Sequence, residues 1–217
     1  MNPFPVELED GRSTSAIRYE PGGRAEALLV LAHGAGAGQR HPFMTAVAKG
    51  LADRGVAVVT FDFLYMHERR RAPDRTELLE DTFRRAIAAA GHAADRGRLF
   101  IGGKSMGGRI ATHLAAQPQA HVKGVVAFGY PLHPPGKPEQ LRIAHFAGIR
   151  VPLLIVQGER DAFGTPEELR THVATIPSPV TLHVVAGGDH SLAVKGRSQA
   201  DVLGPVLDAT REWMTSF

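Results

Sequence analysis

The stretch that decides the fold is LFIGGKSMGGR, at residues 99–109. It begins with apolar residues typical of a buried strand and continues into Gly-x-Ser-x-Gly, with Ser105 at the centre. A serine on a sharp turn between a strand and a helix has a strained backbone, which leaves no room for bulky side chains two residues before and after it. Gly103 and Gly107 meet that requirement. We therefore expect Ser105 to be a nucleophile presented at the start of a helix.

The context of the motif matters, because a chain with 24 glycines can contain the five-residue pattern Gly-x-Ser-x-Gly by chance. After the serine, Met106, Ile110 and Leu114 recur on one face, which predicts a helix over 105–117. The unpaired N–H groups at its first turn could stabilise an oxyanion. Strand, turn and helix are thus predicted in the order that a catalytic serine needs.

Two nucleotide-binding interpretations of the glycine-rich segments fail on spacing. A phosphate-binding loop that ends in Gly103-Lys104-Ser105 needs a glycine five positions before Gly103, where Arg98 stands. A dinucleotide-binding loop at Gly34-Ala35-Gly36 needs a third glycine where Gln39 stands. Neither segment therefore predicts a nucleotide site.

Length and composition favour one globular domain over residues 1–217. The chain has 43% hydrophobic residues and a formal net charge of only +3, so we expect no nucleic-acid partner. It has no cysteine, which excludes disulfides and thiolate metal ligands. The first residues lack a signal-peptide pattern and no apolar run reaches the length of a membrane span. The expected location is cytoplasmic, without membrane attachment.

The order of apolar segments predicts an α/β fold. Strands are expected at 27–32, 56–61, 99–101, 122–128, 152–156 and 180–185, each nearly continuous in hydrophobicity, as in parallel sheets covered on both faces. Helices are expected between them, at 41–54, 76–92, 105–117, 139–146, 165–175 and 199–215. This alternation indicates a mostly parallel central sheet with helices on both faces. Residues 6–19 can add one or two antiparallel edge strands around a turn at Asp10-Gly11.

A serine nucleophile needs a histidine base and a carboxylate that orients the base. In this fold the expected order is serine, acid, histidine. Asp161 follows the strand at 152–156 and His190 follows the strand at 180–185, so both should reach the sheet edge that carries Ser105. Glu159, Asp189 and Asp62 are rival candidates for the acid. Asp161 is preferred because Asp189 adjoins the base and Asp62 precedes the serine.

The segment HGAGAG, which starts at His33, follows the first strong strand. A flexible loop there can direct a backbone N–H toward a developing oxyanion. We expect the donors to be the N–H groups of Ala35 and Met106. His33 is more suited to ordering this loop by hydrogen bonding than to acting as a base.

These motifs resemble the α/β-hydrolase superfamily over residues 27–217. The sequence is most similar to small, lid-free members of the dienelactone-hydrolase-like group, and within it to a branch that shares His-Gly-Ala-Gly after the first strand and Gly-Gly-Lys-Ser-Met-Gly-Gly-Arg at the serine turn. The resemblance implies a hydrolase without a cap domain, with a triad of Ser105, Asp161 and His190, and with no metal or organic cofactor. Dienelactone hydrolases themselves use a cysteine, which this chain lacks.

Two classes of function follow from the sequence. The preferred hypothesis is a serine hydrolase of a small carboxylic ester or thioester. The alternative is a catalytically silent binding protein, because animal relatives of the branch include a subunit of a chromatin complex and a fold alone does not give a function.

Substrate contacts are expected from loops at the carboxyl edge of the sheet, 62–74 and 130–138. The first of these carries several basic residues that suit an acidic substrate. They are equally compatible with a solvated surface. The candidate substrate-binding residues are His33, Tyr65, Arg69, Arg70 and Lys104.

Overall fold

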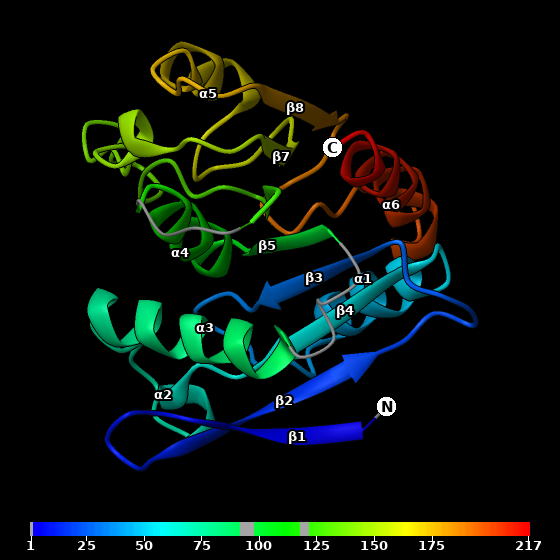
Figure 1. Cartoon of the computed structure of the whole chain (residues 1–217). Helices are drawn as coiled ribbons and strands as arrows, with labels where there is room; N and C mark the ends of the chain where they lie inside the picture. Colours follow the sequence, from blue (N-terminus) through cyan, green and yellow to red (C-terminus); the bar gives the residue numbers. More distant parts are fainter. Residues whose placement is uncertain (1, 92–97, 118–121) are drawn as a thin grey trace.

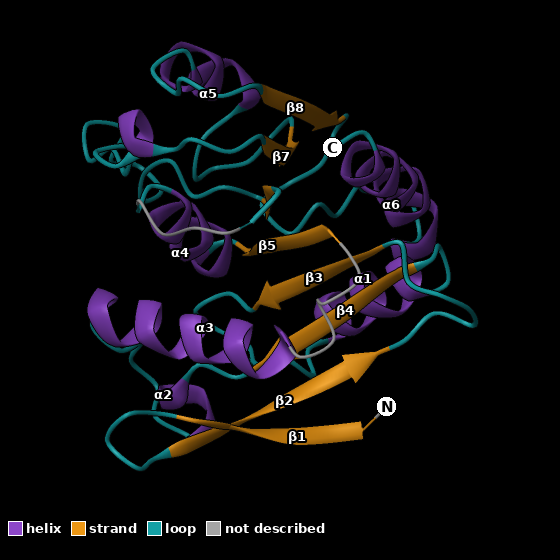
Figure 2. Ribbon diagram, in the orientation of Figure 1, coloured by secondary structure: helices purple, strands orange, loops and turns teal. Residues whose placement is uncertain are grey.

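The computed structural model describes residues 2–91, 98–117 and 122–217. Its centre is one eight-stranded sheet (Figures 1 and 2). The strands follow the order β1 (Asn2–Glu7), β2 (Ser13–Tyr19), β4 (Val56–Phe61), β3 (Ala27–Ala32), β5 (Arg98–Lys104), β6 (Gly124–Phe128), β7 (Leu153–Gly158) and β8 (Val180–Val185). From β4 to β8 all neighbours are parallel, whereas β2 pairs antiparallel with both β1 and β4. The predicted fold class is confirmed.

Continuous burial explains why the parallel strands have uninterrupted apolar sequences. All six residues of β3 and all six of β4 are buried, because helices cover both faces of the sheet. On one face, alternate residues of β3 pack with α3 (Thr76–Ala90) and α4 (Met106–Ala115). On the other face they pack with α1 (Pro42–Ala52) and α6 (Gln199–Thr215). The core is therefore two apolar layers separated by the sheet.

The N-terminal segment forms an antiparallel hairpin at the edge of the sheet, as the sequence predicts. Its turn contains Gly11, which has a φ of 81°. The first strand starts earlier than expected and includes Pro3 and Pro5. An edge strand tolerates proline because one side of its backbone needs no ladder partner.

One predicted helix is wrong. Residues 139–145 form no helix, and only Phe146–Gly148 adopts a short 3-10 turn, η2. The N–H of Arg142 instead donates to the carbonyl of Leu132 at 2.8 Å, so the segment folds back on the loop after β6. Tertiary contacts have overridden a weak local pattern. The described residues between β6 and β7 contain no other helix, so no cap domain is inserted there.

Two further elements complete the structure. The short helix α2 (Leu64–His67) lies in the loop 62–74, where no helix was predicted. Helix α5 (Pro166–Val173) begins with a capping box in which Thr165 and Glu168 bond to each other's backbone N–H groups. The predicted end of α3 at His92 lies outside the described residues. None of the described helices combines the length and the apolar composition that crossing a membrane requires.

Candidate active site

Ser105 occupies a strained turn between β5 and α4. Its φ is 51° and its ψ is −114°, a combination that non-glycine residues rarely adopt. A Cβ on Gly103 would come within 2.4 Å of the backbone of Gly107, and one on Gly107 within 2.5 Å of the carbonyl of Ala32. The close approach of strand and helix that presents the serine therefore requires glycine at both positions.

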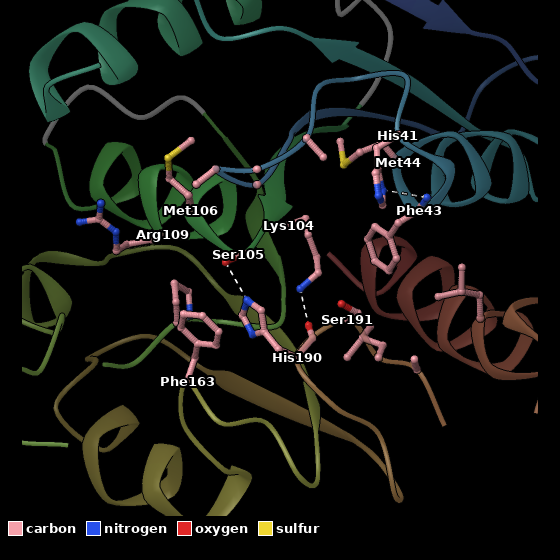
Figure 3. Close-up of a pocket in the computed structure, with 18 of the residues that line it drawn as sticks. His41, Phe43, Met44, Lys104, Ser105, Met106, Arg109, Phe163, His190 and Ser191 are labelled. Atoms are coloured by element: carbon pink, nitrogen blue, oxygen red, sulfur yellow. Dashed lines mark hydrogen bonds between the residues drawn. The ribbon is translucent and has the colours of Figure 1, made fainter. Parts of the chain in front are cut away.

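The structure brings three predicted side chains into one hydrogen-bonded chain. The Nε2 atom of His190 lies 2.8 Å from Ser105 Oγ (Figure 3). The Nδ1 atom of the same ring lies 2.8 and 2.9 Å from the two carboxylate oxygens of Asp161. Asp161 is only 1% exposed, so its charge is held against the imidazole rather than in water. This is the geometry by which a carboxylate orients a general base next to a hydroxyl nucleophile.

Two residues that the sequence analysis missed support the acid and the base. Buried Gln157 donates through Nε2 to Asp161 Oδ2 at 2.9 Å, and the N–H of Phe163 donates to Oδ1 at 2.8 Å. The Phe163 ring also stacks on His190, with 4.0 Å between ring centroids (Figure 3). The sequence signal that could have indicated Gln157 is its polar side chain near the end of the otherwise apolar strand β7.

The rival carboxylates have other hydrogen-bond partners. Asp189 Oδ1 accepts from the N–H groups of Ser191 and Ala193 at 2.8 and 2.9 Å, which fixes the loop that carries His190. Glu159 accepts from Gly187 N–H at 2.7 Å. Asp62 accepts from the backbone N–H of Gln39 at 2.7 Å. Each of the three therefore shapes a loop, and Asp161 alone of the four bonds to His190.

Lys104 reaches from the end of β5 into the site. Its ammonium donates to the backbone carbonyl of His190, and it lies 5.7 Å from the centre of the Phe43 ring. Burial lowers the pKa of Lys104 to about 8, although the charges of Asp161 and Asp189 oppose this shift. The lysine thus connects β5 to the loop that carries His190.

A cavity of about 670 Å³ opens above Ser105. It is lined from the loop after β3, the start of α1, the end of the loop 62–74 and the start of α3, the serine turn, the loops after β6 and β7, the histidine loop and the start of α6. Figure 3 shows Arg109 on one side of Ser105 and Phe43 and Met44 on the other. Lys104 also lies on the Phe43 side, so basic side chains flank Ser105 on both sides, with Phe43 and Met44 beside Lys104.

The expected oxyanion donors, Ala35 and Met106, both line this cavity. Among the described residues no acceptor is bonded to either N–H group. The carbonyl of Ala35 accepts a hydrogen bond from the Tyr65 hydroxyl at 2.8 Å, which ties the loop after β3 to α2.

Two predicted substrate-binding residues hold loops instead of facing the cavity. His33 is fully buried, accepts at Nε2 from the N–H of Phe63 at 3.0 Å and faces the carbonyl of Gly34 with Nδ1 at 2.7 Å. Its pKa is lowered by burial, which keeps the ring neutral. Tyr65 is likewise fully buried. Neither residue is among those that line the cavity.

The arginines of the loop 62–74 also lie away from the cavity. Arg70 pairs with Glu68 at 2.7 Å and with Asp74 at 2.6 Å, and Arg69 is exposed with a φ of 59°. From this loop the cavity is lined by Pro73 and Asp74. Of the five predicted substrate-binding residues, only Lys104 therefore lines it. Within the described ranges, no group of three histidine or acidic side chains could hold a metal ion.

The parallel sheet with a serine turn after its fifth strand is typical of one class, the α/β hydrolases. A model of the family described as alpha/beta hydrolase domain matches residues 25–215. The chain belongs to this family, as the motifs predict. The β1–β2 hairpin lies outside the matched residues.

Solved structures of similar fold extend over nearly the whole chain. A dienelactone hydrolase from Anabaena variabilis is 20% identical with a TM-score of 0.79, covering 100% of this chain and 97% of its own. An α/β serine hydrolase without a lid from Xanthomonas campestris is 18% identical with a TM-score of 0.76, covering 98% and 94%. An α/β serine hydrolase homologue from Coxiella burnetii is 19% identical with a TM-score of 0.74, covering 99% and 96%. At these identities the likeness concerns the fold.

Proposed function

We propose that this protein is a serine hydrolase that cleaves a small carboxylic ester or thioester through an acyl-enzyme. The observation that carries the proposal is the continuous hydrogen-bonded chain from Ser105 Oγ through His190 to buried Asp161. Such a chain converts a weak hydroxyl nucleophile into a reactive one. The family membership and the folds of the similar α/β serine hydrolases support the same reaction class.

In the first half of the proposed reaction, Ser105 Oγ bonds to the ester carbonyl carbon while its proton moves to His190 Nε2. The carbonyl π electrons move to the oxygen, which the N–H groups of Met106 and Ala35 stabilise. Asp161 accepts the Nδ1–H hydrogen bond and stabilises the imidazolium. The carbonyl then re-forms, the carbon–oxygen or carbon–sulfur bond breaks, and His190 gives its proton to the departing alcohol or thiol.

In the second half, water replaces the alcohol. His190 takes a proton from the water as its oxygen bonds to the acyl carbon, and then returns a proton to Ser105 Oγ as the acyl bond breaks. The products are a carboxylic acid and the free enzyme. Every proton is returned, so the cycle requires no cofactor.

Covalent labelling tests the proposal. A fluorophosphonate should label the wild-type protein, and Ser105→Ala should abolish both labelling and ester hydrolysis while the protein stays folded, because the removed hydroxyl provides chemistry rather than packing. Ser191→Ala removes another serine of the same cavity and should still be labelled. Labelling that persists in Ser105→Ala would contradict the assignment. A wild-type protein with neither labelling nor activity across an ester and thioester panel would favour the alternative of a silent binding protein.

A further inference from the structure

We infer that Arg109 and Arg142 form a subsite for a negatively charged substrate group, a carboxylate or a phosphate. The inference rests on the proposed function, because it assigns one end of the cavity to one end of an ester. Both arginines line the cavity together with Ser105. Arg142 belongs to a segment predicted as a helix, so the sequence alone does not place it beside α4.

Both arginines are held in place by backbone hydrogen bonds. Arg109 lies in the first turn of α4, where its N–H donates to the carbonyl of Ser105 at 3.0 Å. The carbonyl of Arg142 accepts from the Tyr130 hydroxyl at 2.6 Å, and its N–H donates to Leu132 at 2.8 Å. These bonds fix the backbone from which each guanidinium extends toward the cavity.

The two guanidinium groups repel each other without compensation from a carboxylate. Burial and the neighbouring charge of Arg109 lower the pKa of Arg142. Among the described residues, neither guanidinium has a carboxylate within 4 Å, and the Arg142 guanidinium donates only to the carbonyl of Pro131, at 3.4 Å. An anion between them would replace repulsion with charge-assisted hydrogen bonds, for which guanidinium is well suited.

Two histidines close to Arg109 are kept neutral and add no charge of their own. The rings of His113 and His145 lie 4.1 Å apart, and the charge of Arg109 contributes to the lowered pKa of both. The one carboxylate at this cluster, Glu80, lies against His113 Nδ1 at 3.2 Å. Among the described side chains that line the cavity, the cations are Lys104, Arg109, Arg142 and Arg197, and the one carboxylate is Asp74. This excess of positive charge raises the local concentration of anionic ligands.

The position of the subsite limits the shape of the substrate. In Figure 3 the guanidinium of Arg109 extends away from Ser105, while Phe43 and Met44 lie on the opposite side of the serine. We therefore expect the anionic group on the Arg109 side of the scissile carbonyl. The other substituent of the ester faces Phe43 and Met44, beside which Lys104 lies.

Matched esters test this subsite. One pair consists of 4-nitrophenyl hydrogen adipate and its neutral methyl ester. In the second pair, a 4-nitrophenyl ester of the same chain length ends in a phosphate in one compound and in the neutral dimethyl phosphate in the other. The wild type should show a kcat/KM at least about tenfold higher for the anionic member of one pair at low salt. The pair with the larger ratio identifies the anion. Arg109→Gln and Arg142→Gln should each lower that ratio at least threefold, while Arg142→Lys retains part of it.

Arg211→Gln is the matched control, because Arg211 pairs with Glu26 at 2.8 Å and neither residue lines the cavity, and its ratio should equal that of the wild type. Ratios near one in the wild type would overturn the subsite but leave the hydrolase intact. Calorimetry of adipate and of a phosphate monoester with Ser105→Ala separates binding from catalysis. If adding Arg142→Gln to Ser105→Ala weakens the binding of either anion, the subsite is supported even if no ester is cleaved. If neither anion binds, or if Arg142→Gln leaves the affinity unchanged, the subsite is contradicted.

Discussion

At the scale of single residues, the candidate site depends on which carboxylate is left to orient His190. Asp189 adjoins the histidine but uses its carboxylate to bond two N–H groups of its own loop. Asp161 comes from the neighbouring strand, where it is buried and held by Gln157 and by the N–H of Phe163. The adjacent acid therefore shapes the loop, and the distant acid contacts the ring.

Asp161→Asn tests this division. The amide should keep the fold but favour the wrong tautomer of His190, so kcat should fall by about 10⁴-fold. Steady-state kinetics with an aryl ester measures the change, and circular dichroism verifies the fold. Glu159→Gln is the control, because Glu159 bonds only Gly187 N–H among the described residues and should retain most activity. If Glu159→Gln lost activity to this extent and Asp161→Asn did not, the acid would be misassigned.

The sequence could nominate Ser105, Asp161 and His190 because each follows a recognisable strand, and parallel strands end at one edge of the sheet. It could not nominate Gln157 or Arg142 in the same way. Gln157 is positioned by hydrogen bonds to the backbone of Tyr130 and Gly164. The backbone of Arg142 is positioned by hydrogen bonds to the Tyr130 hydroxyl and to Leu132. These contacts depend on how two loops pack, which no local pattern encodes.

At the scale of elements, the junction of β5 and α4 is the most constrained part of the fold. A Cβ on Gly103 would come within 2.4 Å of Gly107 and 2.6 Å of Gly108, both at backbone atoms that cannot rotate away. The strand and helix would have to separate. The strained serine between them would then lose its position over the helix N-terminus.

Gly103→Ala should therefore lower the free energy of unfolding by about 1–3 kcal/mol or more and reduce esterase activity more than this loss of stability explains. Gly23→Ala is the control, because a Cβ there meets nothing within 4 Å and should change the free energy of unfolding by about 1 kcal/mol or less. Urea titrations of both variants measure the two effects. Equal stability in Gly103→Ala and the wild type would show that the junction is less rigid than described.

Elements were predicted best where burial on both faces determines the sequence. The predicted strands at 27–32 and 56–61 agree with β3 and β4 to the residue. The strand at 180–185 also agrees with β8, although β8 is an edge strand and only Val185 in it is buried. Prediction failed for 139–146, where Arg142 bonds back to Leu132 instead of forming a helix. It also missed α2, a single short turn whose first N–H groups are satisfied partly by Asp74. Long-range hydrogen bonds decided both segments.

At the scale of the whole molecule, the packing that buries both faces of the sheet also buries basic side chains. Burial is the largest cause of the lowered pKa of His33, His113 and His145, and the pKa of His145 falls to about 3. The unfolded chain binds a proton at His145 below about pH 6.5, whereas the folded chain does so only near pH 3. Stability should therefore fall as the pH falls from 6.5 toward 3.

His145→Gln isolates one such contribution. Between pH 7.5 and pH 5 the wild type should lose about 1–2 kcal/mol more unfolding free energy than the variant, because glutamine cannot bind the proton. Urea titrations at the two pH values measure the difference. Equal losses in both proteins would mean that His145 titrates normally in the folded state.

Helix α6 joins two distant parts of the molecule. Its first turns line the cavity at Val202 and Leu203, while Trp213 near its other end packs on Phe100, with 5.8 Å between ring centroids. Trp213 is the one tryptophan of the chain. The protein thus carries an intrinsic fluorophore on the element that connects the cavity to the core. Emission from the unlabelled protein reports directly on whether α6 is docked, and every variant described above can be checked for folding in this way.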